Sequence, residues 1–382
     1  MGDICDLLCG YAFDGEDITE EGKYLLLRGI NITEGVIRHS VELDRYYSGS
    51  VEKLGKYKLV IGDLVIGMDG SKVGRNSALV SADENGSYLV QRVCRIRSMV
   101  GNNYVLQLVN NVRFHKYVDT VKTSSAIPHI SLKDIQNFKI AIPSTQEEAN
   151  KISNLMYLLD ERIATQNKII DKLQSLIKGL NDSLYAQYGG KVLTSFAELG
   201  TSYSGLSGKS AQDFGSGKPF ITYLNVYSNN VINENEFQYV AIKDDEKQNV
   251  AEYGDVLFTL SSETPREVGI GSVYLGKEKV YLNSFCFGIH ITNMEVAFPP
   301  YLSYYVSSTA FRKFIYPYAQ GSTRFNLCKA DFEKASIKLP TLENQKRIYS
   351  ILSHIDNKII TERQMLDLYN SQKQYLLRQM FI

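Results

Sequence analysis

The residue types that most often carry catalysis are present in this sequence, but not in catalytic arrangements. Residues 298–301 read Phe-Pro-Pro-Tyr, superficially like the motif in which an Asp or Asn before two prolines accepts the hydrogens of a target amine. A phenylalanine ring cannot accept them. Two prolines are more typical of a first helical turn, here expected over residues 301–314. The sequence also lacks a glycine-rich turn for S-adenosylmethionine and a GxxxxGK[ST] phosphate loop. We therefore predict no catalytic residue in this chain.

The five histidines and five cysteines do not indicate a metal site. Neither set shows the paired spacing of zinc ligands, and an odd number of scattered cysteines also argues against a disulfide framework. No apolar segment approaches the roughly 20 residues that cross a bilayer. We expect a soluble cytoplasmic protein without a membrane segment. The net charge is +0, which excludes a general polycation but leaves local basic patches open.

Basic residues at two places in the first half could contact DNA. Lys72 and Arg75 lie on a glycine-rich loop, where the backbone can approach DNA closely while cationic groups reach phosphate or guanine. Arg95 and Arg97 lie on an alternating strand pattern, so their side chains share one face and could contact phosphates. The plainer alternatives are a solvated hairpin for the loop and an ordinary polar surface for the strand.

Further DNA-binding candidates lie in the second half. Arg266 is at a predicted loop tip, and Tyr223 with Asn225 ends a predicted strand that could face a groove. Ser322 and Arg324 are in a short basic and polar motif that could serve DNA contact, scaffolding or the docking of a partner. Packing is the more common use of tyrosine, so base stacking remains the weaker interpretation of the tyrosine-rich composition.

Two long helices are the clearest predicted elements, over residues 144–187 and 341–382. Apolar residues recur in both at alternating steps of four and three, an average of 3.5, which keeps one stripe facing a partner helix. We call this stripe the seam, and a polar residue interrupts it at the same place near its middle in each helix, Gln166 in the first and Glu362 in the second. The first seam is Ile152, Met156, Leu159, Ile163, Gln166, Ile170, Leu173, Ile177, Leu180 and Leu184, and the second is Ile348, Leu352, Ile355, Ile359, Glu362, Leu366, Tyr369, Lys373, Leu376 and Met380.

The segments before the helices, residues 1–143 and 188–340, contain short β-type runs separated by Gly, Asn, Asp and Ser. Both contain Gly-Asp followed by two aliphatic residues, at 62–65 and 254–257, but they are otherwise divergent. We predict an α+β fold with two pseudo-symmetric recognition domains, each a mixed β-sheet with helices, joined by two long antiparallel coiled-coil helices. The expected strands are 24–32, 57–66, 88–96, 138–142, 220–226, 255–260, 273–275 and 287–291.

The short link between the first helix and the second domain determines the expected topology. The second domain must begin near the far end of that helix, so the second helix can pair only with the first, antiparallel to it. About 35 helical residues span roughly 50 Å, or on the order of 15 base pairs. The helices would then hold two DNA-reading domains a helical turn or more apart. We expect Gln166 and Glu362 to meet at the crossing and fix the register.

The chain resembles, over essentially its whole length, the specificity subunits of type I restriction-modification systems, in which target-recognition domains alternate with conserved helices. The most specific match is Gly-Ser-Thr-Arg-Phe-Asn-Leu at 321–327, which is followed by Asp331-Phe332 and by Ile-Lys-Leu-Pro at 337–340. Residues 126–132 are a looser version of the same motif. The strand and glycine-rich loop at 62–75 are also similar to the family, while their counterpart departs at 260–271.

The resemblance implies a non-catalytic subunit that reads a bipartite double-stranded DNA target. It would bind two methyltransferase subunits through the helices and adjoining faces, and it leaves open whether restriction subunits join them. S-adenosylmethionine, ATP and Mg²⁺ would belong to those partners, with no cofactor on this chain. The alternative is a coiled-coil interaction scaffold or inhibitor that does not read DNA, and a self-sufficient nuclease or methyltransferase is third.

Overall fold

The computed structural model describes residues 1–380 and divides the chain into two compact units. Unit 1 comprises Met1–Asn167 and the chain from Gln364 on, and unit 2 comprises Lys168–Arg363. Each unit therefore contains part of both long helices. The compact units cut across the four consecutive segments expected from the sequence.

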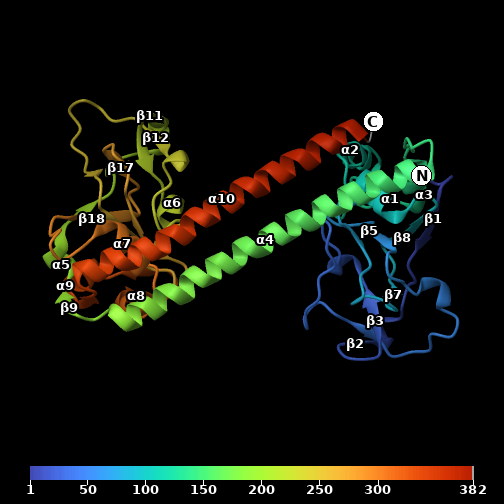
Figure 1. Ribbon diagram of the computed structural model, residues 1–382, viewed down its shortest axis with the longest axis horizontal. Helices are drawn as coiled ribbons and strands as arrows, with labels where there is room; N and C mark the ends of the chain where they lie inside the picture. Colours follow the sequence, from blue (N-terminus) through green and yellow to red (C-terminus); the bar gives the residue numbers. More distant parts are fainter. Residues whose placement is uncertain (381–382) are drawn as a thin grey trace. The chain divides into compact units, whose positions relative to one another are not determined.

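Unit 1 is built on an antiparallel sheet of four strands in the order β1-β8-β5-β6. The alternating residues of β5 pack in opposite directions: Ile66 contacts the helices after the sheet, and Val65 faces a second layer. Both faces are covered, which explains why β5 is apolar and buried throughout. The elements are β1 (Cys5–Cys9), β5 (Leu64–Gly67), β6 (Ser77–Leu79), β8 (Val93–Ser98), α1 (Asn102–Val109), α2 (Val112–Val121) and α3 (Leu132–Asn137) (Figure 1).

The second layer of unit 1 is a smaller sheet in the order β2-β4-β3-β7. Its β3–β7 pair is parallel, whereas β4 runs antiparallel to both β2 and β3. Leu27 and Leu89 from this sheet pack against Val65 and Val93 of the first. The strands are β2 (Ile18–Thr19), β3 (Tyr24–Leu27), β4 (Tyr46–Tyr47) and β7 (Tyr88–Leu89).

Unit 2 has the corresponding antiparallel sheet in the order β10-β18-β14-β16. Its helix-covered face is an aromatic core in which Phe258, Phe287, Phe311 and Phe332 are buried together. The elements are β10 (Gly200–Ser204), β14 (Val256–Thr259), β16 (Gly271–Val273), β18 (Cys286–Ile291), α5 (Phe196–Leu199), α7 (Pro299–Tyr305), α8 (Thr309–Ile315) and α9 (Lys329–Lys334).

Three smaller sheets complete unit 2. One has the order β12-β11-β17-β13 and includes a parallel β11–β17 pair, another has the order β15-β20-β19, and β9 pairs antiparallel with β21. The elements are β9 (Val192–Thr194), β11 (Phe214–Ile221), α6 (Tyr223–Ser228), β12 (Gln238–Val240), β13 (Val250–Ala251), β15 (Ser261–Ser262), β17 (Val280–Leu282), β19 (Ala319–Gln320), β20 (Phe325–Leu327) and β21 (Ile337–Leu339).

The two units repeat one topology. The order β1-β8-β5-β6 matches β10-β18-β14-β16, and the parallel β3–β7 pair matches β11–β17. The strand registers also agree, because Gly67 lies opposite Val93 where Thr259 lies opposite Cys286. The predicted α+β fold with two similar domains is thus confirmed, and the internal repeat extends from the helices into the sheets.

The long helices are α4 (Gln146–Tyr188), with 43 residues, and α10 (Leu342–Met380), with 39 residues (Figure 1). Every seam residue of both helices is buried or half-buried, as the 3.5-residue repeat predicts. In unit 1, Asp160 forms an ion pair with Lys373, and Arg162 donates a hydrogen bond to the Tyr369 hydroxyl. The higher-numbered residue of one helix pairs with the lower-numbered residue of the other, so the two helix segments run antiparallel there.

The helix segments in unit 2 are also antiparallel. Arg347, near the start of α10, lies 5.3 Å from the ring of Tyr188 at the end of α4, and Leu184 shares a core with Ile348 and Leu352. Gln166 and Glu362 are both buried, and Glu362 forms an ion pair with Lys358. Their expected meeting at a helix crossing remains a prediction.

Several expected elements are shorter than predicted or differ in type. The strand expected over 88–96 is interrupted between β7 and β8 at Arg92, whose φ of 69° breaks the extended backbone. The strand expected over 220–226 ends at Ile221, because the Thr222 side chain caps α6. The helix expected over 301–314 is two helices, since Ser308 caps a new start at α8. The strand expected over 138–142 is not formed within the described residues.

Candidate nucleic-acid interface

The loop between β5 and β6 presents the two basic residues predicted for it. Lys72 and Arg75 are exposed, and they form ion pairs of 3.0 Å with Glu34 and Asp119, respectively. The loop turns at Gly74, whose φ is 71° and where an added Cβ would lie 2.8 Å from a Val118 methyl. Exposed ion pairs of this kind are worth about 0–1 kcal/mol. A DNA phosphate could therefore replace either carboxylate at little cost.

Arg95 and Arg97 share one face of β8 as predicted, but both are engaged within unit 1. The Arg95 side chain is only 6% exposed, and it donates to Asp6 at 2.6 Å and to the Lys56 carbonyl. Arg97 donates two hydrogen bonds to buried Asp63, which raises the pKa of its guanidinium. We correct Arg95 to a structural residue, because its burial leaves no charged group for a phosphate.

Asp255 occupies the position in unit 2 that Asp63 occupies in unit 1. Each lies just before the equivalent strand and accepts a backbone hydrogen bond from the residue three positions earlier. Where Asp63 binds Arg97, Asp255 binds His290 at 2.9 Å and also accepts from the Tyr203 hydroxyl at 2.7 Å. Burial raises the pKa of Asp255. The same buried carboxylate thus has a different basic side chain as its partner in each unit.

Two of the five candidate residues of unit 2 line a surface pocket of about 460 Å³. Tyr223 lines it and donates from its hydroxyl to the Ser261 carbonyl at 2.9 Å. Arg324 lies on the same pocket, with its guanidinium 6.0 Å from the ring of Phe285. Sequence reasoning missed three apolar and aromatic residues of this lining, Leu224, Tyr227 and Phe285. No local pattern marks them, because exposed and buried apolar residues look alike in sequence.

Two glutamates also line this pocket, Glu263 and Glu267. Glu267 accepts hydrogen bonds from Tyr227 and Thr264, both at 2.8 Å, and from Ser262 at 3.1 Å. These hydroxyl groups lower the pKa of its carboxyl. Glu263 is exposed. Among residues 1–380, neither carboxylate forms an ion pair with Arg324, so the guanidinium remains available on the pocket rim.

The remaining predicted residues of unit 2 are placed differently. Asn225 is fully buried in α6, where its side chain donates to the Asn233 carbonyl and accepts from the Asn233 amide. We correct it to a structural residue. Ser322 and Arg266 are exposed, and the Arg266 carbonyl accepts from Arg312, which also donates to the carbonyls of Val268 and Gly269. Arg312 therefore anchors the loop that presents Arg266.

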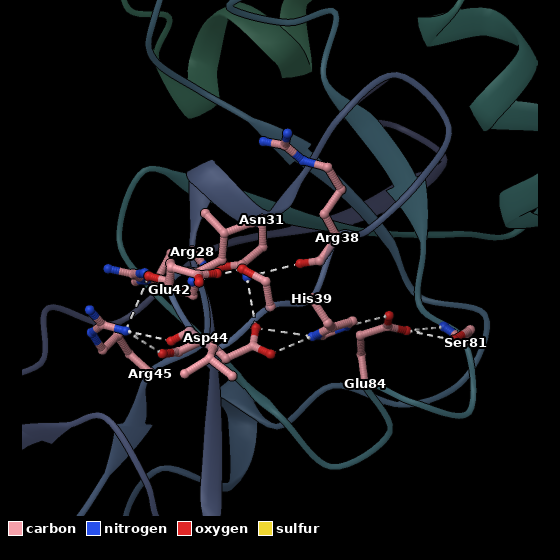
Figure 2. Close-up of polar contacts among 12 residues, drawn as sticks. Arg28, Asn31, Arg38, His39, Glu42, Asp44, Arg45, Ser81 and Glu84 are labelled. Carbon is pink, nitrogen blue, oxygen red and sulfur yellow. Dashed lines mark hydrogen bonds and ion pairs between the residues drawn. The ribbon is translucent and has the colours of Figure 1, made fainter. Parts of the chain in front are cut away.

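A separate polar cluster in unit 1 centres on His39 (Figure 2). Its ring lies between two carboxylates, with Nδ1 3.0 Å from Asp44 and Nε2 2.9 Å from Glu84. Partial burial opposes the charge on the ring, but these hydrogen bonds outweigh it and raise the pKa of His39. Burial opposes the charge of Glu84 too, yet its bonds to His39 and Ser81 lower its pKa. Asn31, three residues before Glu34, also donates a hydrogen bond to Asp44, so the cluster adjoins the segment that carries Glu34, the partner of Lys72.

Within the described residues, no group of three or more His, Cys, Asp or Glu side chains is arranged to hold a metal ion. None of the described helices has the length and apolar character that a membrane crossing needs.

Two segments of the chain, residues 1–175 and 201–368, match the family described as type I restriction modification DNA specificity domain. The fold is similar to the crystal structure of the type I restriction-modification system S subunit from M. genitalium, with 15% identity and a TM-score of 0.59, covering 100% of this chain and 94% of that chain. It is also similar to a chain from a structure describing complex assembly and conformational transition of the type I R-M system, with 16% identity, a TM-score of 0.58, and 99% and 95% coverage.

Proposed function

Because this chain belongs to the family of type I restriction modification DNA specificity domains, we propose that it reads a bipartite DNA target, with one half-site contacted by each unit. The observation that carries the proposal is the placement of exposed cations on equivalent loops. Lys72 and Arg75 lie between β5 and β6, and Arg266 lies between β14 and β16. Equivalent loops with different residues suit a shared scaffold that recognises two different sequences.

The chemistry of these loops favours DNA over the alternative of a protein-only scaffold. Lys72 and Arg75 are paired only with exposed carboxylates, so phosphates can compete for them. Phosphate contacts of this kind would position the protein, and base contacts would add specificity. The net charge of +0 then restricts DNA attraction to these local surfaces.

We further propose that the chain is a non-catalytic subunit that docks two methyltransferase subunits on its long helices and adjoining faces. Large apolar residues outside the seam support such docking, because solvent is a poor environment for them. S-adenosylmethionine, ATP and Mg²⁺ would be held by the partner subunits, and restriction subunits would join the same assembly. The exposed apolar residues include Leu155, Leu158, Leu176, Ile360, Leu368 and Tyr375.

The test is co-expression with the cognate methyltransferase subunit, followed by mapping of methylated adenines in the DNA of the cell. We expect one split motif whose two halves are separated by a constant number of bases. A stable complex that methylates no split motif would favour the scaffold alternative. Failure to form any complex would contradict docking on the helices.

The helices are expected to act as a ruler for the spacer between the half-sites. Deleting seven residues from the middle of both α4 and α10 preserves the seam and removes about 10 Å of helix. We expect the preferred spacer to shorten by about three base pairs, as measured by the same methylation mapping. An unchanged spacer in an assembled complex would rule out the ruler, and deletion from one helix alone is the matched control.

A further inference from the structure

The residue directly before β8 in unit 1 and the residue directly before β18 in unit 2 occupy equivalent positions. In unit 1 this residue is Arg92, whose carbonyl accepts from the Met68 amide at 2.9 Å. In unit 2 it is Phe285, whose carbonyl accepts from the Leu260 amide at 2.9 Å. Met68 and Leu260 begin the equivalent loops that carry the candidate cations. Both Arg92 and Phe285 therefore lie at the base of a candidate DNA-reading loop.

A second pair of equivalent positions adjoins the same loops. The Ile130 amide donates to the Met68 carbonyl, just as the Leu327 amide donates to the Leu260 carbonyl. Ile130 and Leu327 are therefore equivalent, and so are the residues three positions before them, Ile127 in unit 1 and Arg324 in unit 2. The bridges agree with this count, because Asp69 lies opposite His129 and Ser261 lies opposite Asn326.

In each unit one of the two positions holds an arginine and the other holds an apolar residue, and the arginine is at the first position in unit 1 and at the second in unit 2. Unit 1 has a guanidinium at the first position and an aliphatic side chain at the second, Arg92 and Ile127. Unit 2 has an aromatic ring at the first and a guanidinium at the second, Phe285 and Arg324. Ile127 is 66% exposed and Phe285 is 56% exposed, and both arginines are exposed as well. Exposure of all four leaves them available to a ligand.

The arginines in these positions also differ from three candidate cations of unit 1. Lys72, Arg75 and Arg97 each pair with a carboxylate. By contrast, within residues 1–380 neither the Arg92 nor the Arg324 side chain makes a hydrogen bond or ion pair, and the Arg324 guanidinium lies over the Phe285 ring. Arg92 is also the one non-glycine residue of the described chain with a positive φ, 69°. Such strained backbone conformations concentrate at functional sites.

We propose that the residues at these two positions form a base-reading pair in each unit, in which the arginine and the apolar residue have exchanged places between the units. Arg92 reads a guanine in the first half-site and Arg324 reads a guanine in the second, each through the O6 and N7 edge in the major groove. Ile127 and Phe285 contact the methyl groups of thymines beside those guanines. The inference rests on the proposed DNA-reading function and specifies its chemistry.

The test uses the complex with its methyltransferase subunit and duplexes carrying the mapped target. Each guanine is replaced in turn by 7-deazaguanine, which lacks N7, and each thymine by uracil, which lacks the methyl group. We expect one 7-deazaguanine position in each half-site to weaken binding of the unaltered complex, by less than the roughly 5- to 150-fold of a full bidentate contact, because the analogue keeps O6. A neighbouring uracil should give a smaller loss.

Variants assign each contact to its residue. Arg92→Gly should make binding insensitive to 7-deazaguanine in the first half-site only, and it relieves the positive φ, so misfolding would not explain a loss. Arg324→Ala should have the same effect in the second half-site. Phe285→Ala should abolish the uracil effect there. Lys72→Ala is the control: it should weaken binding to every duplex equally and reduce the salt dependence.

Three outcomes separate the inference from the function on which it rests. Analogue sensitivity that disappears in the matching variant supports the base-reading pair. Sequence-specific binding with the same analogue sensitivity in Arg92→Gly and Arg324→Ala as in the unaltered complex would overturn the pair and leave the proposed function intact. If the unaltered complex neither binds nor methylates a split motif, the proposed function fails first.

Discussion

The two units place the same buried aspartate in the same turn but give it different partners. Asp63 meets Arg97, whose charge is permanent, and Asp255 meets His290 and the Tyr203 hydroxyl. Arg97 and His290 occupy equivalent positions on β8 and β18. Both units keep the carboxylate and its backbone hydrogen bond, whereas the partner across the sheet differs. The sequences of the two units therefore differ on the strands of the main sheets as well as in the loops.

We expect the largest effect of a single substitution on unfolding free energy at Arg312, which anchors the loop of unit 2 that carries Arg266. Arg312 donates to three carbonyls of the unit 2 loop. Arg312→Met removes these hydrogen bonds and leaves the carbonyls unpaired. We expect this to lower the unfolding free energy by about 2–3 kcal/mol. We expect faster hydrogen exchange at 262–270 and loss of recognition of the second half-site alone. Lys313→Met, a neighbouring exposed position, is the control, and equal exchange in both variants would refute the anchor.

A smaller effect on unfolding free energy is expected when either of the two aspartates is replaced. Asp63→Asn should lower the unfolding free energy by about 1–2 kcal/mol, because it removes a charged pair to the partly exposed Arg97. Asp255→Asn should cost less than about 1 kcal/mol, since burial already raises the pKa of that carboxyl and asparagine retains an acceptor for Tyr203. Urea unfolding of both variants measures the contrast. A larger loss for Asp255→Asn would reverse our interpretation of the comparison.

The smallest effect is a pH dependence in unit 1. The raised pKa of His39 contributes stability that is complete below its ordinary pKa of 6.5 and is lost as pH rises through the folded value. The lowered pKa of Glu84 contributes stability above its ordinary 4.5 that is lost as pH falls through the folded value. The cluster therefore contributes most between these two ordinary values.

His39→Gln should remove the decline in stability on the alkaline side, an effect of about 0.5–1 kcal/mol for a partly exposed group. Unfolding free energies measured from pH 5 to 8 provide the check, with His354→Gln on α10 as a control histidine. The His39 assignment would be wrong if the two variants retained the same slope.

The long helices were predictable because their signal is local. A 3.5-residue repeat identifies each seam without knowledge of the rest of the chain, and all seam residues are shielded as expected. Tertiary pairing is not local in this way. The partners of Arg95 and Arg97 lie 89 and 34 residues away, at Asp6 and Asp63, so an alternating strand alone could not show that these arginines are engaged.

The candidate site was predictable only in part. The glycine-rich loop correctly placed Lys72 and Arg75 on the surface, because such loops are exposed. Asn225 was misplaced, although Thr222 offered a helix-capping signal in the sequence. The exchanged positions of Arg92 and Arg324 become visible only when strand registers align the two units, because their sequences have diverged too far for a residue-by-residue comparison.

The antiparallel pair of β9 and β21 brackets the globular part of unit 2 in the sequence. Thr194 lies opposite Ile337 and Val192 opposite Leu339, so the chain enters and leaves the globular part of unit 2 along one strand pair. The segment between these two strands therefore begins and ends at adjacent positions, which the backbone hydrogen bonds of the strand pair hold together. A different sequence could be recombined into this segment if it kept the contacts with the long helices, such as the hydrogen bond from the Asn181 side chain to the Tyr304 carbonyl. If unit 2 reads one half-site as proposed, exchange of residues 194–337 for the matching segment of a related chain should change that half-site and leave the other unchanged.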